Sequence, residues 1–222
     1  MIIHPTNLSA TLDETAEAFF HQQHLSDTQR EEITAMIISR QCLTGVNAGF
    51  FVPFAAESET KVKLFSGEQL NTALAHNHSL MIEAVRILKL LAMENHAVTQ
   101  SILLADHCME KMCYSNFCAK GECKALTIAY LRYLSLDRTG NSAPRINTHL
   151  TNLTSYRNGK YKWGGFPYFY TLLMLLEIED PLALEELHYA APTFEKQLAQ
   201  NWPADPISKR RQEIIKKALA RS

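Results

Sequence analysis

Residues 80–112 read LMIEAVRILKLLAMENHAVTQSILLADHCMEKM, and this stretch decides the fold class. Apolar residues recur in it every three or four positions, a spacing that places their side chains on one face of an α-helix. The first such stripe consists of Leu80, Ala84, Ile87, Leu88 and Leu91, and the second consists of Val98, Ile102, Ala105, Met109 and Met112. We therefore predict two amphipathic helices whose apolar faces are buried in a protein core.

Signals for helix starts predict further helices over the rest of the chain. A Ser or Thr followed three residues later by Glu or Gln can form a capping box, and this pattern occurs at Thr11, Ser26 and Ser66. Asp180 precedes Pro181, and proline is favourable at the first position of a helix. The predicted helices span residues 12–23, 27–41, 67–76, 79–94, 96–113, 122–135, 142–155, 166–178, 181–190, 192–200 and 208–220.

The predicted fold is therefore all-α. Short turns between successive helices favour antiparallel helix pairs in an α/α array, which would form a partial toroid or a superhelix. An irregular helical bundle is the alternative. We expect at most one short β-hairpin, near residues 48–65, where two apolar segments read as extended. Because no linker rich in Pro, Gly or Ser divides the chain, we expect a single domain spanning residues 1–222.

The charge of the chain argues against nucleic acid as a partner. Its 22 Lys and Arg residues nearly cancel its 23 Asp and Glu residues, so no overall field attracts a polyanion. The longest apolar run, residues 166–176, is about half of the roughly 20 residues that cross a bilayer. The N-terminal residues lack the pattern of a secretory signal. We therefore expect a cytoplasmic protein without a membrane span.

Four cysteines recur at intervals of five residues: Cys108, Cys113, Cys118 and Cys123. Thiolates are good zinc ligands, and polar and glycine residues between the last three cysteines could bend the chain so that they converge. Candidate metal ligands are therefore Cys113, Cys118, Cys123 and the nearby His107, with zinc as the candidate cofactor. The alternative is that these cysteines are small buried hydrophobic residues, which is a common role of reduced cysteine.

Aromatic residues surround a glycine pair in the segment WGGFPYFY, residues 163–170. Glycine lets a backbone or a ligand approach closely, so the segment could line an apolar pocket. The candidate pocket residues are Trp163, Phe166, Tyr168 and Tyr170. The alternative is that these side chains belong to the core, as aromatic residues at helix junctions often do.

The longer stretch from Leu153 to Leu187, which contains this segment, resembles the repeat of α/α-toroid proteins, the terpenoid cyclases and protein prenyltransferases. In that repeat a helix ends, a glycine-containing turn carries a tryptophan, and an apolar helix follows. The resemblance implies paired helices but no cyclase activity, because the aspartate cluster of those enzymes has no counterpart here. A bacterial family of all-helical proteins is also similar to this chain, in residues 45–51, 117–123, 131–134 and 163–170 taken together. This resemblance implies no particular chemistry.

The sequence contains neither a serine elbow nor a phosphate-binding glycine loop. We therefore expect a helical binding or scaffold protein without catalytic activity. The alternative is an enzyme or small-molecule binder that uses an aromatic pocket around Trp163–Tyr170, together with a cysteine-coordinated metal. Whether the chain is an enzyme stays open, and its expected partner is either a protein or a small apolar ligand.

Overall fold

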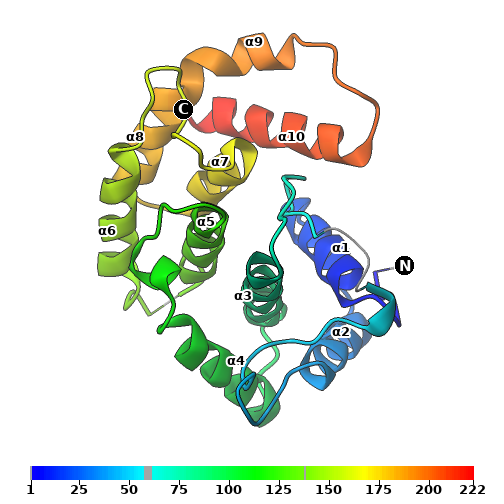
Figure 1. Ribbon diagram of the computed structural model, residues 1–222. Helices are drawn as coiled ribbons and strands as arrows, with labels where there is room; N and C mark the ends of the chain where they lie inside the picture. Colours follow the sequence, from blue (N-terminus) through cyan, green and yellow to red (C-terminus); the bar gives the residue numbers. More distant parts are fainter. Residues whose placement is uncertain (1, 58–61, 138) are drawn as a thin grey trace. The chain divides into compact units, whose positions relative to one another are not determined.

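The computed structural model describes residues 2–57, 62–137 and 139–222, and these residues form an all-α fold (Figure 1). The helices are α1 (Leu8–Phe20), α2 (Asp27–Ser39), α3 (Ala73–Leu91), α4 (His96–Met109), α5 (Cys123–Leu134), α6 (Ala143–Thr154), α7 (Tyr168–Glu177), α8 (Pro181–Ala190), α9 (Phe194–Leu198) and α10 (Pro206–Arg221). Short 3₁₀ helices are η1 (Ala55–Glu57), η2 (Cys113–Asn116) and η3 (Ala191–Thr193). The predicted all-α fold class is confirmed.

Extended pairing in the described residues is limited to isolated β-bridges. They join Gln41 to Phe51, Lys63 to Gln69 and Arg157 to Trp163. No β-strand forms near residues 48–65 in the part of that range that the structure describes, and residues 58–61 lie outside it. None of the described helices combines the length and apolar character that a bilayer crossing needs. The choice between an α/α array and an irregular bundle stays a prediction.

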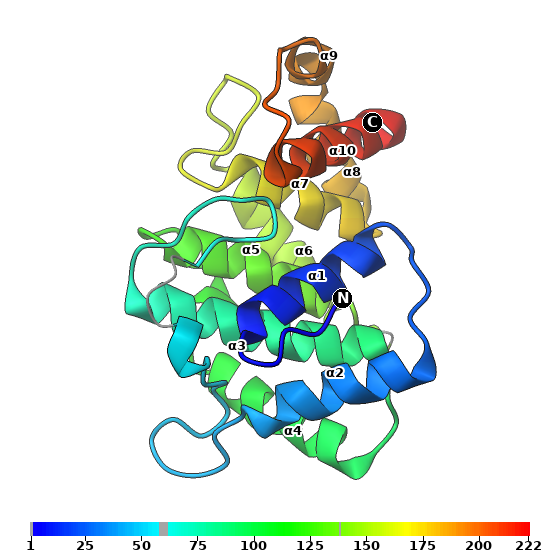
Figure 2. The same ribbon diagram turned by 90° about the vertical axis from the view of Figure 1, so that its right-hand side faces the viewer.

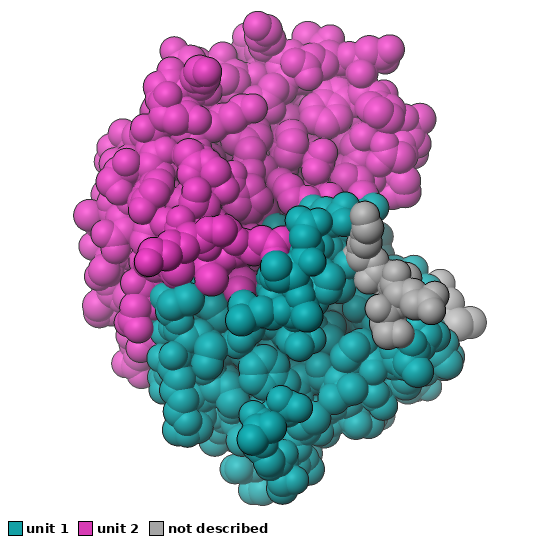
Figure 3. Space-filling view, viewed as in Figure 1, with its two compact units in different colours: residues 1–65, 69–115 teal, residues 66–68, 116–222 magenta. Residues whose placement is uncertain are grey.

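Contacts divide the chain into two compact units, coloured separately in Figure 3. Unit 1 comprises Met1–Phe65 and Gln69–Ser115, and unit 2 comprises Ser66–Glu68 and Asn116–Ser222. The expectation of a single domain spanning residues 1–222 stays a prediction.

The core of unit 1 is built around α3, which packs against α1, α2 and α4 (Figure 2). The whole predicted stripe of α3 is buried, from Leu80 to Leu91. Met81, Ile82 and Val85 are buried as well, because helices cover α3 on more than one side. On α4 the stripe residues Val98, Ala105 and Met109 are buried.

The core of unit 2 is built around α7, which packs against α5, α8 and α10. Residues Leu172 to Leu175 of α7 are all buried. Arg132 of α5 is also buried, and its guanidinium donates two hydrogen bonds of 2.8 Å to the Glu177 carboxylate. The same guanidinium lies 4.9 Å from the ring centroid of Tyr170. A buried charge needs such a partner, and here the partner comes from the central helix.

Two predicted helix starts are confirmed. Ser26 and Gln29 form the predicted capping box at the start of α2. Asp180 accepts a hydrogen bond from the Leu182 N–H at the start of α8, directly before Pro181.

The start predicted at Thr11 is wrong, because α1 begins at Leu8 with Asn7 as its N-cap. The Asn7 side chain accepts a hydrogen bond from the Ala10 N–H, and the distant Glu57 carboxylate accepts hydrogen bonds from Leu8 and Ser9. This tertiary contact satisfies the first N–H groups of the helix and allows it to begin before Thr11.

The start predicted at Ser66 is also wrong, because residues 67–72 are not helical. The Ser66 hydroxyl donates to the Glu68 carboxylate, and α3 begins at Ala73 with Thr72 as its N-cap. The predicted helices 67–76 and 79–94 therefore correspond to one helix that starts later.

Candidate metal centre

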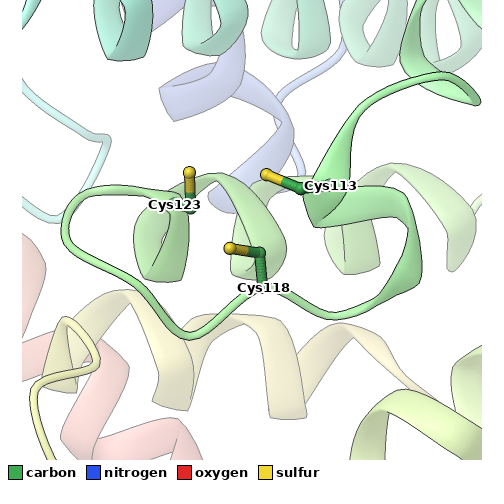
Figure 4. A group of neighbouring side chains, drawn as sticks. All are labelled: Cys113, Cys118 and Cys123. Atoms are coloured by element: carbon green, nitrogen blue, oxygen red, sulfur yellow. The ribbon is translucent and has the colours of Figure 1, made fainter.

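The sulfur atoms of Cys113, Cys118 and Cys123 lie within 4.8 Å of one another, and the three side chains are neighbours (Figure 4). All three residues lie in one continuous stretch of chain. In the residues that the structure describes, no other set of three or more His, Cys, Asp or Glu side chains gathers its ligand atoms in this way. Cys113 is exposed, whereas Cys118 and Cys123 are half-buried.

The end of α4 makes this convergence possible. On a continuous helix, residues five apart point about 140° from one another, so a helix over 96–113 followed by more helix would separate the thiols. Instead α4 ends at Met109, and η2 begins at Cys113. The Ser115 hydroxyl donates to the Met112 carbonyl over 2.7 Å and fixes this turn. The predicted helix 96–113 is therefore four residues too long. Because residues 110–113 do not continue α4, Cys113 can face the next segment.

Phe117 turns the chain toward Cys118. Its φ angle is +63°, in the left-handed region that costs a non-glycine residue roughly 1–2 kcal/mol. Its ring contacts the rings of His149, Tyr156 and Phe166, with centroid distances of 5.7, 5.9 and 5.8 Å. These contacts hold Phe117 in the unfavourable conformation and thereby fix the direction in which the chain enters Cys118.

The backbone of Cys118 is tied to α5 by a side chain. The Thr127 hydroxyl donates to the Cys118 carbonyl over 2.9 Å and accepts from the Cys118 N–H over 3.2 Å. Thr127 is fully buried on α5, so it offers a rigid support. Cys118 is therefore held at both of its backbone polar groups.

Cys123 is the first residue of α5. The positive end of a helix dipole favours negative charge at this position. The next residue, Lys124, donates to the Gly164 carbonyl over 3.0 Å. Gly165, with φ +75°, leaves room for this amine, because a Cβ there would lie 2.3 Å from the Lys124 Nζ atom. The glycine pair thus anchors the first turn of α5.

His107, the fourth candidate ligand, is not brought into the group. It lies on α4 with an exposed side chain, and its Nε2 atom is 2.8 Å from the Lys111 Nζ atom. Cys108 points elsewhere, since its thiol donates to the Ala48 carbonyl over 2.8 Å. Burial raises the pKa of the Cys108 thiol, against the opposite effect of Lys111. All five cysteines carry thiols and none forms a disulfide.

The three sulfur atoms suit a thiophilic metal ion. A Zn–S bond is about 2.3 Å, so sulfur ligands of a tetrahedral zinc lie about 3.8 Å apart. A separation within 4.8 Å reaches that geometry through small side-chain movements. Metal binding would require the thiols to lose their protons.

The aromatic candidates are packed against protein neighbours. Trp163 is buried, and its indole N–H donates to the Glu186 carboxylate over 2.7 Å. Tyr170 is fully buried beneath Arg132. The Tyr168 hydroxyl hydrogen-bonds to Thr193 and Gln197, and burial raises its pKa. Phe166 is buried and contacts Phe117. A ligand pocket formed by Trp163, Phe166, Tyr168 and Tyr170 stays a prediction.

Sequence reasoning missed the residues that support the cysteine group. No sequence pattern identifies Thr127 or Lys124 as a supporting residue. Each forms hydrogen bonds with a backbone that only the fold brings near, Cys118 for Thr127 and Gly164 for Lys124. Phe117 is adjacent to Cys118, but a positive φ at phenylalanine is not readable from the sequence. The glycine pair Gly164–Gly165 is a signal that the sequence does offer, since glycine often marks a place where another group approaches the backbone closely.

A separate cavity of about 420 Å³ lies in unit 1, next to the loop after α2. Its lining includes Phe50, Phe51, Val52, Leu74, Asn77 and His78. The Nδ1 atom of His78 is 3.1 Å from the Tyr114 hydroxyl, and burial lowers the pKa of this histidine. The lowered pKa favours the neutral form of the imidazole at neutral pH.

Comparison of the chain with protein-family models, with curated proteins and with solved structures finds no match.

Proposed function

We propose that this chain is a helical metal-binding protein that holds a thiophilic ion such as Zn²⁺ through the thiolates of Cys113, Cys118 and Cys123. The single observation that carries the proposal is the convergence of their three sulfur atoms within 4.8 Å. Thiolates are soft ligands, and sets of cysteines at such separations suit zinc and other thiophilic ions.

Exposure favours this proposal over a packing role for the cysteines. A cysteine that serves as a small hydrophobic residue is usually buried, as free cysteines in cores are. Cys113 is exposed, and Cys118 and Cys123 are only half-buried, so burial of apolar surface does not explain their position.

The residues that hold the three cysteines in place also favour a metal-binding role. Phe117 keeps an unfavourable backbone conformation immediately before Cys118, and such strain concentrates at functional sites. Thr127 and Lys124 fix the two ends of the loop between Cys118 and Cys123. A cytoplasmic location belongs to the proposal, because reducing conditions keep cysteines available as metal ligands.

Titration of the full-length, reduced chain with Co²⁺ tests the proposal. We expect thiolate-to-cobalt charge-transfer absorption that saturates at one ion per chain. Replacing Cys113, Cys118 or Cys123 by serine should weaken binding by about tenfold or more, because each change removes a ligand.

Matched controls come from the other cysteines and from His107. Cys42→Ser, Cys108→Ser and His107→Ala should bind Co²⁺ as the unchanged chain does. The proposal is wrong if no charge-transfer band appears, or if Cys42→Ser reduces the band as much as Cys118→Ser does.

The cavity in unit 1 favours a second candidate function, the binding of a small ligand with both apolar and polar groups. Its volume of about 420 Å³ lies in the range of small-molecule sites, and its walls combine apolar and polar surface, including the His78 imidazole, whose pKa is lowered by burial. Nuclear magnetic resonance of His78 during titration with indole would test this function. A saturable change at the His78 ring that is lost in Leu74→Trp, a change at the cavity wall, would support it, and an unaffected ring would exclude indole-like ligands.

A further inference from the structure

We propose that the metal centre is open, and that its fourth coordination position takes an exogenous thiol rather than a side chain of this chain. This inference rests on the proposed metal-binding function and specifies the ligand class that the centre accepts. It separates a reactive, exchangeable site from a closed structural one, because structural zinc sites use four protein ligands and open sites use three.

The first line of support is the number of donors. In the part of the chain that the structure describes, the group contains three sulfur atoms and no His, Asp or Glu side chain. Two other residues that the sequence offers as ligands, Cys108 and His107, are turned to other partners. The Cys108 thiol donates to the Ala48 carbonyl, and the His107 ring lies 2.8 Å from the Lys111 amine.

The second line of support is the uneven exposure of the three ligands. Cys118 and Cys123 are half-buried, and the backbone of Cys118 is held by Thr127. Cys113 is exposed, so the group has one side that an incoming ligand can reach. An ion bound here would have two protected sulfur ligands and an accessible face beside the third.

A thiol is the ligand class that best completes this donor set. Three thiolates already present a soft environment, and a fourth sulfur gives the all-cysteine type of set that zinc accepts. The incoming thiol releases its proton to solvent, a metal–sulfur bond forms, and the water at the fourth position leaves. No electron is transferred. The start of α5 at Cys123 offsets part of the added negative charge.

Absorption spectroscopy of the Co²⁺-loaded full chain tests the inference. The protein is reduced with a phosphine, desalted and titrated with 2-mercaptoethanol. Because the number of Co–S bonds rises from three to four, we expect the charge-transfer intensity to rise by about one third and to saturate. In Cys113→Ser the added thiol should restore the intensity of the three-sulfur site, and Cys42→Ser should respond as the unchanged chain does.

The outcomes separate this inference from the function on which it rests. A Co²⁺–thiolate band that 2-mercaptoethanol does not change means a closed site, which overturns the inference and leaves metal binding intact. A response to azide or imidazole that equals or exceeds the response to the thiol overturns the thiol class. Absence of any Co²⁺–thiolate band overturns the proposed function itself.

Discussion

The ring of Phe117 lies against the ring of Phe166, with 5.8 Å between their centroids. Phe117 precedes Cys118, and Phe166 follows the glycine pair that receives Lys124. The contact therefore joins the aromatic segment to the cysteine segment, two features that the sequence presents about 40 residues apart. The aromatic side chains act as the support of the cysteine group through this contact.

Two substitutions at Phe117 separate backbone strain from ring packing. Phe117→Ala and Phe117→Gly both remove the ring, but only alanine keeps a Cβ at a positive φ. We expect the glycine variant to be more stable than the alanine variant by about 1 kcal/mol, the reverse of their usual order in regular structure. Urea unfolding of both variants measures the difference. An alanine variant as stable as the glycine variant would show that position 117 is not strained.

The glycine pair offers a second matched comparison. Gly165→Ala places a Cβ at φ +75° and 2.3 Å from the Lys124 Nζ atom, so the amine must leave the Gly164 carbonyl. At Gly164 the nearest atom to an added Cβ is 3.6 Å away, an ordinary contact. We expect Gly165→Ala to lower the free energy of unfolding by roughly 1–2 kcal/mol and Gly164→Ala by clearly less. Equal losses in thermal and urea unfolding would contradict the role assigned to Gly165.

Glu57 makes stability depend on pH. Burial alone would raise its pKa, but the backbone N–H groups of Ser9, Phe54 and Leu8 together lower it below the ordinary value of 4.5. A lowered folded-state pKa stabilises the protein above the unfolded-state pKa, and the stabilisation is lost as the pH falls through the folded-state value.

Glu57→Gln should therefore cost about 1–3 kcal/mol at neutral pH, because it removes one charged acceptor from buried N–H groups. The difference between the two proteins should shrink as the pH falls below 4.5. Urea unfolding at a series of pH values checks both statements. A difference that stays constant down to the acid limit would exclude the pKa shift as its origin.

The two tryptophans differ in the acceptor that each uses. Trp163 is buried and donates to the Glu186 carboxylate, whereas the less buried Trp202 donates to the Gln197 carbonyl. Because hydrogen bonds to charged groups contribute more, Trp163→Phe should lower stability by about 1.5–3 kcal/mol and Trp202→Phe by less. Chemical unfolding followed by circular dichroism measures both. A smaller loss at Trp163 would argue against a core role for this side chain.

Helices whose signals lie in neighbouring residues could be predicted from the sequence. Apolar stripes gave α3 and α4, since the period of an α-helix is written in neighbouring residues. The capping box at Ser26 was also readable, because its partner Gln29 is three residues away. The start of α1 was not, since Glu57 satisfies its first N–H groups from a distant part of the chain.

In the candidate site, too, the features set by neighbouring residues could be predicted, and those set by distant contacts could not. The polar and glycine residues between Cys113, Cys118 and Cys123 allow the chain to bend so that these cysteines converge, and the structure brings their sulfur atoms together. His107 was a candidate through proximity in sequence alone, and α4 carries it to Lys111 instead. The conformation of Phe117 depends on rings that follow it by some tens of residues, which no local pattern reveals.

The most direct test of the metal centre is X-ray absorption at the zinc edge of the zinc-loaded, full-length chain. We predict a first coordination shell that contains three sulfur atoms at about 2.3 Å, and the loss of one of them in Cys118→Ser but none in Cys108→Ser. A shell of only nitrogen and oxygen, or a sulfur shell that Cys118→Ser leaves unchanged, would contradict metal binding by these three cysteines.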